Sequence, residues 1–390
     1  MEIPKLKDAR ATIRAFCETR LADGIPYREQ HQQLEPGLLE ALFEAGLMGL
    51  EVASPHYSRP ESALFPEPLP FQHLMLLIEE SSRVDPSVSV VLHVHNVLFN
   101  RLLERFGNEE QKSLWLPLLA QKIVGAFAVT EPDAGSDLSA LTLTATRSGD
   151  GFVLNGRKRW ITSAREAGLF AVFAKIPQNS GADTLGCFLV QRETAGLSIA
   201  DNTPKLSMRG SSTCELSFEE VFLPASALLG NERSGADIAQ YALCMGRAGI
   251  AAQMLGIAQG ALTLAVRYAE ERPAFGERIA QFQGVSFPLA QASTEISLLR
   301  VYVYQLAKKV DAGQSILKLM DEANKAKLFA SQVAERTASQ AVETLGGNGV
   351  AEAYDVERFY RNAKVGKIYE GTVNILLRSI AAGLTREHLS

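Results

Sequence analysis

The spacing of apolar residues changes twice along the chain, and each change marks a different kind of predicted structure. Up to about residue 125, apolar residues recur at helical spacing, for example through 38–46 and 87–103. The stretch 53–70 departs from this pattern, because its five prolines forbid a regular helix and indicate an extended loop. The first part of the chain, residues 1–125, is therefore predicted to be an N-terminal α-helical domain.

From residue 126 the apolar positions alternate with polar ones, as in half-buried strands. Leu141–Thr146 shows this alternation, and Asn155-Gly156 is a typical turn signal for a β-hairpin. Further strands are predicted at 168–176, 185–192 and 214–223. The pattern indicates a middle antiparallel β domain over residues 126–232.

After Gly230 the helical spacing returns and continues to the end of the chain. The predicted helices cover 236–271, 283–312, 316–345, 352–364 and 372–384. They indicate a C-terminal four-helix bundle over residues 233–390, of the kind that often mediates oligomerisation. The fold class is thus α+β.

The apolar stretch 248–266 raises the question of a membrane span. Gln253 and Gln259 interrupt it, and Arg247 lies at its border. A buried helix in a large helical core fits this composition better than a transmembrane helix. No membrane association is predicted.

Composition and charge narrow the class of protein. Of the 390 residues, 46% are apolar and 21% charged, and the formal net charge of −5 argues against a nucleic-acid partner. The four cysteines are scattered without a CxxC pair, which favours reduced thiols and a cytoplasmic protein. The start of the chain has no signal-peptide pattern. His93 and His95 are two residues apart on a predicted helix, so they do not share a face; a structural role is favoured, and no metal site is predicted.

The loop that follows the apolar run 126–129 is rich in small, hydroxyl and acidic residues: Thr130-Glu131-Pro132-Asp133-Ala134-Gly135-Ser136-Asp137. Such a loop offers backbone N–H groups and side-chain oxygens to a polar ligand, and Gly135 allows close approach. The string resembles the flavin-contacting signature of the acyl-CoA dehydrogenase family. Other segments in the same order extend the resemblance over the whole chain, towards the short-chain members: 155–162, 208–224, 245–259, 272–283, 343–349 and 367–372.

The resemblance implies FAD as cofactor and assigns residues to it. The flavin ring would contact residues of the 126–137 segment and of the Trp-Ile-Thr segment: Phe127, Val129, Thr130, Gly135, Ser136, Trp160, Ile161 and Thr162. Arg272 and Gln283 would hold the pyrophosphate, with Phe275 beside it, since a guanidinium offers forked donors to phosphate oxygens. The segment that reaches the dinucleotide of a neighbouring subunit would contribute Glu343, Leu345, Gly346 and Gly347, and the last motif Thr372 and Asn374.

The resemblance also assigns the chemistry. Glu370 would remove the Cα proton of an acyl thioester while hydride leaves Cβ for flavin N5. Burial beneath substrate and flavin would make the carboxylate a stronger base, and the Glu370 backbone N–H would bind the thioester oxygen. Substrate contacts are implied for Ser136, Cys244, Arg247 and Gly371. Electron-transfer flavoprotein would accept the electrons from a homotetramer built as a dimer of dimers.

Several positions depart from the family pattern. Cys244 stands where short-chain members carry an aspartate near the pantetheine arm, Glu343 replaces a common glutamine, and Asn374 replaces a frequent glutamate. The loop 53–70 lacks the usual glycine-rich turn. These departures leave the substrate open between a short-chain acyl-CoA and an acyl group tethered to a carrier protein. A flavin oxidase or monooxygenase on the same fold is a further alternative, which oxygen reactivity would distinguish.

Overall fold

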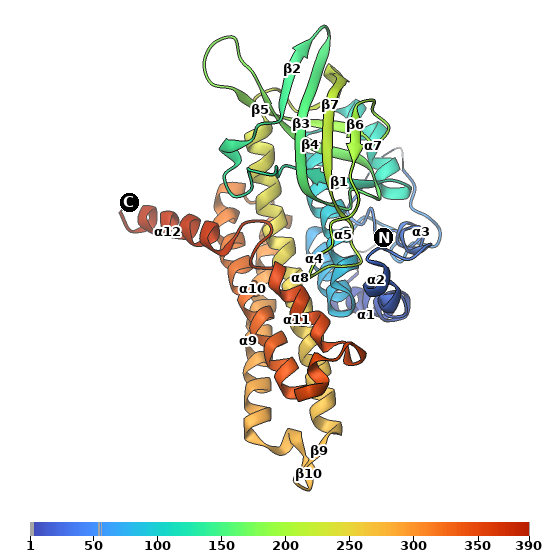
Figure 1. The fold of residues 1–390 in the computed structure, drawn as a ribbon, viewed down its shortest axis with the longest axis vertical. Coiled ribbons are helices and arrows are strands. Elements are labelled where there is room, and N and C mark those ends of the chain that lie inside the picture. Colours follow the sequence, from blue (N-terminus) through green and yellow to red (C-terminus); the bar gives the residue numbers. More distant parts are fainter. Residues whose placement is uncertain (1–3, 54, 56, 390) are drawn as a thin grey trace.

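Three long helices form the lower half of the molecule in the computed structural model, which describes residues 4–53, 55 and 57–389 (Figure 1). They are α8 (Gly235–Glu271), α9 (Gln283–Asp311) and α10 (Ile316–Leu345), each packed against the other two. The shorter α11 (Val356–Val365) packs against α8 and α10, whereas α12 (Val373–Leu389) projects sideways from the body (Figure 1). The predicted helices of the C-terminal part are present, and the two-residue strands β9 (Pro273–Ala274) and β10 (Glu277–Arg278) form the lower tip.

The N-terminal part is helical, as the apolar spacing predicts. Its helices are α1 (Leu6–Phe16), α2 (Ile25–His31), α3 (Leu38–Glu44), α4 (Phe71–Val84), α5 (Pro86–His93), α6 (Arg101–Phe106) and α7 (Glu109–Gln121). The π-helical segments η1 (Cys17–Leu21) and η2 (Val94–Asn100) continue α1 and α5. Since η2 joins α5 to α6 without a break, His93 and His95 lie on one continuous helical segment, as predicted.

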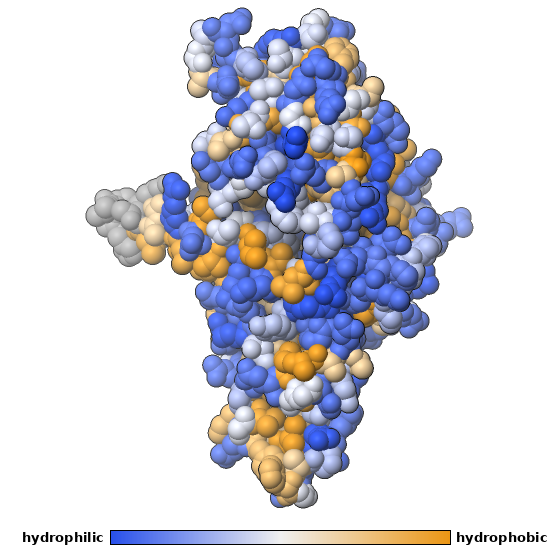
Figure 2. Space-filling view, viewed as in Figure 1, coloured by the Kyte–Doolittle hydropathy of each residue, from blue (hydrophilic) through white to orange (hydrophobic). Residues whose placement is uncertain are grey.

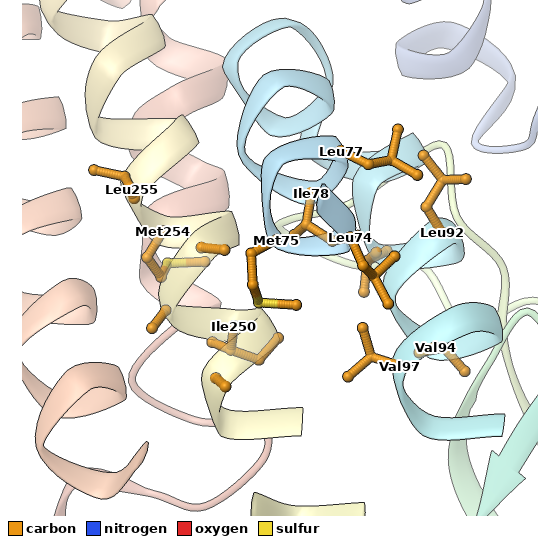
Figure 3. Close-up of a cluster of buried hydrophobic side chains, with 14 of the residues drawn as sticks. Leu74, Met75, Leu77, Ile78, Leu92, Val94, Val97, Ile250, Met254 and Leu255 are labelled. Carbon is orange, nitrogen blue, oxygen red and sulfur yellow. The ribbon is translucent and has the colours of Figure 1, made fainter. Parts of the chain in front are cut away.

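α8 is the core helix of the protein. It buries residues around most of its circumference, because α4 covers one side and α9 and α10 cover others. Figure 3 shows Ile250 of α8 facing Met75 of α4 across this apolar contact; Ile78, Met254 and Leu255 belong to the same buried cluster. Among the described helices, α8 alone is long and apolar enough to cross a membrane, but 78% of its most apolar window is buried inside the protein. That burial is typical of a core helix.

The middle of the chain folds into a sheet at the upper end of the molecule (Figure 1). Its strands are β1 (Val124–Ala128), β2 (Thr144–Ser148), β3 (Gly151–Thr162), β4 (Ala167–Ile176), β5 (Thr184–Gln191), β6 (Leu197–Ile199), β7 (Thr213–Pro224) and β8 (Leu228–Leu229). They lie in the order β6-β7-β3-β2-β4-β5-β8, with β1 beside β4. Most pairs are antiparallel, as predicted, but β4 pairs in parallel with β1 and β2. Alternation reveals which face a side chain occupies and not the direction of the neighbouring strand.

The hairpin predicted at Asn155-Gly156 is wrong. β3 continues through both residues, and the chain turns earlier, at 148–151. Asn155 pairs with β7 instead: its Oδ1 accepts from Glu220 N at 2.9 Å and its Nδ2 donates to Glu220 Oε1 at 2.7 Å. Gly156 has φ +138° at a register shift, and a Cβ there would lie 2.8 Å from Leu143 Cα. The glycine therefore serves a β-bulge and a close backbone approach within a long strand.

Candidate active site

A cavity of about 770 Å³ lies where the sheet meets the upper part of α8. Its walls come from α5 and η2, the loop after β1, the end of β3, the loop before β7, α8, and the loop between α11 and α12. The cavity brings together many of the predicted site residues: Phe127, Val129, Thr130, Gly135, Ser136, Trp160, Ile161, Thr162, Arg247, Glu370, Gly371 and Thr372. Segments more than 200 residues apart in sequence thus line the same cavity.

A second group of predicted cofactor residues lies elsewhere, at the lower tip of the bundle: Arg272, Phe275, Gln283, Glu343, Leu345, Gly346 and Gly347. Arg272 follows Arg247 by 25 residues of helix, a separation of about 37 Å at 1.5 Å per residue. The two tip segments lie together, since Asn348 Nδ2 donates to Tyr268 Oη at 3.0 Å. One copy of the chain therefore keeps the two halves of the predicted cofactor site apart.

Apolar side chains are exposed at this tip. Phe275 is 97% exposed and Phe287 62% exposed, and Figure 2 shows apolar surface gathered at the lower end of the molecule and where α12 leaves the body. Exposed aromatic side chains of this extent indicate a surface that contacts another protein chain.

Two further predicted residues lie outside the cavity wall. Cys244 is fully buried in α8, and burial raises the pKa of its thiol to about 12, so it is a neutral core side chain. Asn374 is exposed in the first turn of α12. Neither residue is placed in direct contact with the space around Glu370.

The loop after β1 is fixed by a buried ion pair that the sequence reasoning did not identify. Lys158 Nζ donates to Glu131 Oε1 at 2.8 Å and to the carbonyl of Val129 at 3.0 Å. Glu131 also accepts from Thr142 N, Thr142 Oγ1 and Leu143 N, at 2.6, 2.8 and 3.0 Å. These bonds explain why the strand predicted to begin at residue 141 begins only at 144: the backbone donors before it bind Glu131.

Burial and pairing act in opposite directions on this ion pair. Burial lowers the pKa of Lys158 to about 8, although Glu131 partly offsets that effect. Burial alone would raise the pKa of Glu131, but the bonds from Lys158 and Thr142 hold it below its usual value. The carboxylate thus remains ionised at neutral pH and anchors the loop that lines the cavity.

Trp160 is presented to the cavity by an irregularity in β3. The pairing of β3 with β7 shifts between Lys158 and Ile161, and Trp160 has φ +62°. The indole is 50% exposed, and the Arg159 guanidinium lies 5.1 Å from its centroid. A left-handed conformation in a bulky residue is costly and often occurs at functional sites; here it belongs to a residue that lines the cavity.

Glu370 lies in a strained loop held by two buried cations. Glu370 has φ +53° and Gly371 φ +104°. Arg247 Nε donates to the Glu370 carbonyl at 3.1 Å, and Lys327 Nζ donates to the Gly371 carbonyl at 2.5 Å. Arg247 is in turn fixed by Asn324 Oδ1 at 2.6 Å. Burial lowers the pKa of Lys327 to about 7, against the opposing effect of the Glu370 charge.

His93 is the neighbour of the Glu370 carboxyl group. Its Nε2 lies 3.3 Å from Glu370 Oε1, and the side chains are 1% and 11% exposed, respectively. His95 points elsewhere and is structural, because its Nδ1 accepts from Gly125 N and its Nε2 donates to the Leu119 carbonyl, both at 3.0 Å. The sequence interpretation is therefore confirmed for the separate faces and for His95, but it missed the position of His93.

Two glycines of α8 make room for this pair. A methyl group at Gly246 would overlap Glu370 Oε2, and one at Gly249 would overlap the His93 imidazole. Glycines in the interior of a long helix lower its helix propensity, so their presence in the sequence indicated that another group packs closely there. Sequence alone did not show what occupied that space.

A second cavity of about 570 Å³ adjoins the first. Both are lined by Leu138, Ala239 and Leu243, and the second continues between α8 and β5 past Lys175 and Asp183. The two cavities therefore lie side by side along the upper part of α8.

Comparison with known proteins gives a consistent result. The sequence matches the family models "Acyl-CoA dehydrogenase, N-terminal domain" over residues 4–122, "Acyl-CoA dehydrogenase, middle domain" over 126–221 and "Acyl-CoA dehydrogenase, C-terminal domain" over 233–385. It is similar to the short/branched chain specific acyl-CoA dehydrogenase, mitochondrial, of Rattus norvegicus, with 39% identity over 96% of this chain and 84% of that protein.

Solved structures agree. Butyryl-CoA dehydrogenase from Megasphaera elsdenii superposes with a TM-score of 0.91 at 32% identity, over 99% of this chain and 100% of the other. The prolyl acyl carrier protein oxidase AnaB superposes with a TM-score of 0.90 at 26% identity, over 98% and 100% of the two chains.

Proposed function

This chain belongs to the acyl-CoA dehydrogenase family and is a FAD-dependent oxidoreductase, and on that premise we propose that it dehydrogenates a short-chain acyl-CoA with Glu370 as the base. The observation that carries the proposal is the cavity in which Glu370 faces the loop after β1 and the Trp160 end of β3. In this arrangement a carboxylate and the residues that we propose to hold the flavin border one space.

The residues around the cavity fit FAD. Backbone groups of 129–136 and the Thr162 hydroxyl offer polar contacts, and the half-exposed Trp160 indole offers a flat apolar one. We propose that these residues hold the flavin ring. FAD supplies the two-electron acceptor that takes the β hydrogen as hydride.

Glu370 takes the other hydrogen as a proton. The carboxylate oxygen gains the proton that Cα loses, and the electron pair left on Cα becomes part of the new double bond as the β hydrogen leaves. Glu370 Oε2 is buried without a hydrogen-bond partner among the described residues, as expected for an atom that receives its partner from the substrate. Arg247 and Lys327 hold the carbonyl groups of Glu370 and Gly371 and so fix the backbone that carries the base.

A short acyl chain fits the walls nearest Glu370, where Val90, Val94 and Leu98 project from α5 and η2. We propose that the thioester extends from there through the adjoining cavity, whose residues Lys175 and Asp183 carry opposite charges. An extended pantetheine arm fits that path. The likenesses to a butyryl-CoA and to a short/branched-chain enzyme support a small acyl group.

A carrier-protein substrate is the second candidate, favoured by two observations. Cys244 takes the place of an aspartate expected near the pantetheine arm, and the fold is close to that of a prolyl acyl carrier protein oxidase. The name of that relative also keeps the oxidase alternative in view.

The separation of the two predicted cofactor segments supports a shared site. We propose a homotetramer, a dimer of dimers, in which the tip of one subunit, with Arg272, Phe275, Gln283 and the 343–347 segment, reaches the FAD dinucleotide whose flavin ring lies in the cavity of another subunit. Domains at 1–125, 126–232 and 233–390, and electron-transfer flavoprotein as acceptor, belong to the same proposal. A cytoplasmic location remains a prediction, and the similar rat protein is mitochondrial by name.

The test is an anaerobic titration of the purified yellow protein with butyryl-CoA, followed by flavin absorbance. Wild-type flavin should bleach promptly, whereas Glu370→Gln should retain FAD and fail to bleach, because an amide cannot accept the proton. Glu219→Gln, at an exposed position on β7, is the matched control and should behave like wild type.

Each other outcome has a definite meaning. Bleaching in Glu370→Gln would refute Glu370 as the base. A wild-type flavin that bleaches with butyryl-carrier protein and not with butyryl-CoA would establish the second candidate. Rapid reoxidation of the reduced flavin by oxygen would favour the oxidase alternative.

A further inference from the structure

Beside the proposed base lies a histidine that neither the family resemblance nor the comparisons assign. We propose that His93 is a positioning residue for Glu370: its neutral imidazole donates from Nε2 to Oε1, holding the carboxylate ionised with Oε2 free for the substrate proton. This inference rests on the proposed function of Glu370. It concerns how the base is oriented and when it is charged.

The burial of His93 determines which proton it carries. Nδ1 is buried without a hydrogen-bond partner among the described residues, and that edge of the ring abuts α8 at Gly249. An imidazolium would place an unpaired N–H there, which is costly, whereas a neutral ring with its proton on Nε2 leaves only an acceptor unpaired. The surroundings therefore favour a neutral donor facing Glu370.

The contact with His93 gives the two oxygens of the Glu370 carboxyl group different surroundings. Oε1 faces His93 Nε2 at 3.3 Å, whereas Oε2 lies beside Gly246 and has no partner within the described part of the chain. A distance of 3.3 Å is long for such a bond, but bonds to catalytic groups commonly shorten once substrate binds. Because Gly246 has no side chain, Oε2 can occupy the place that a Cβ would fill.

Other charged and titratable groups around Glu370 act differently. Arg247 from α8 and Lys327 from α10 donate to backbone carbonyls of the loop, and the Tyr369 hydroxyl bonds Gln253. Among the described residues, His93 is thus the one side chain with a polar atom within hydrogen-bond distance of the carboxylate itself. No group of three potential metal ligands occurs among the described residues.

The consequence concerns pH. Substrate and flavin remove water from Glu370, which favours its neutral form. A hydrogen bond donated to the charged oxygen opposes that effect and keeps the base competent at lower pH. Removing the donor should move the acid limb of the pH–rate profile upward by about one pH unit and slow flavin reduction at neutral pH about tenfold.

The experiment is anaerobic stopped-flow reduction of the FAD-loaded enzyme by butyryl-CoA from pH 5.5 to 9. His93→Leu should move the acid limb upward and lower the limiting rate, with little change in the half-saturating substrate concentration. His93→Gln retains an N–H donor and should restore most of the rate. Gly249→Ala should shift the profile in the same direction, because its methyl group displaces the imidazole without removing it.

Two controls separate positioning from packing and from the proposed function. Gly256→Ala, which would overlap the α4 backbone at Glu79, should lower thermal stability without moving the acid limb. An acid limb unchanged in both His93→Leu and Gly249→Ala would overturn the inference, as would an equal shift in Gly256→Ala. Glu370→Gln is run in parallel: turnover there would refute the base itself, whereas its loss with an unmoved His93→Leu profile would refute only the positioning role.

Discussion

Replacing Lys158 by methionine is expected to destabilise the folded protein by about 3 kcal/mol and to loosen the loop that lines the cavity. Methionine has a similar length and keeps the apolar contacts, so the change removes mainly the charge. Lys158 is fully buried and Glu131 nearly so, and the substitution leaves that carboxylate without its counter-ion.

The size of the expected loss in stability depends on the hydrogen bonds that Glu131 keeps after Lys158 is replaced. Breaking one partner of a buried ion pair costs about 3–5 kcal/mol. The bonds from Thr142 N, Thr142 Oγ1 and Leu143 N persist and still solvate the charge, which places the expected loss at the lower end of that range. The carbonyl of Val129 also loses its donor, so residues 129–136 should become less ordered. A loss of about 1.4 kcal/mol in preorganisation would raise the Kd for FAD about tenfold.

The assay is urea unfolding at pH 7, at fixed protein and FAD concentrations, because bound cofactor and association both contribute to the measured free energy. The double variant Glu131→Gln with Lys158→Met removes both charges and should recover most of the lost stability. A single variant within 1 kcal/mol of wild type, or a double variant less stable than Lys158→Met, would refute the reasoning.

Two further predictions concern the other buried cation and the tip of the bundle. Burial lowers the pKa of Lys327 from 10.5 to about 7, so between these values the unfolded chain binds a proton that the folded chain does not. The stability of wild type relative to Lys327→Met should therefore rise with pH above about 7, by at most about 1.4 kcal/mol per unit, and be flat below it; a pH-independent difference in urea unfolding would contradict this. Arg272→Ala should raise the Kd for FAD about tenfold, by removing a guanidinium from the pyrophosphate; an unchanged Kd in fluorescence titration would exclude a shared cofactor site.

The elements of the fold were largely predictable because local pattern determines them. The helical spacing of 236–271 predicted α8 almost to the residue, and Pro273 ends it. The apolar run at 168–176 likewise predicted β4. Asn155-Gly156 misled because the dipeptide permits a tight turn and equally a bulge, and only pairing with Glu220 on β7 selected the bulge.

The candidate site was predictable only where the family resemblance supplied it. The residues placed around the cavity, such as Trp160 and Glu370, were identified by their motifs. The Lys158–Glu131 pair and the position of His93 were missed, because a buried lysine and a helical histidine carry no local mark of the partner that they meet.

By itself, the sequence determined the order of helical, β and helical segments, the interior position of α8 and the residue types available for flavin and proton chemistry. These follow from periodicity and composition, which act over a few turns of chain. Only the tertiary structure decided that His93 meets Glu370 across 277 positions, that Gly246 and Gly249 leave space for them, and that Arg272 lies far from the cavity. Contacts of this kind depend on how whole helices pack, and packing is fixed by the shape of every surface at once.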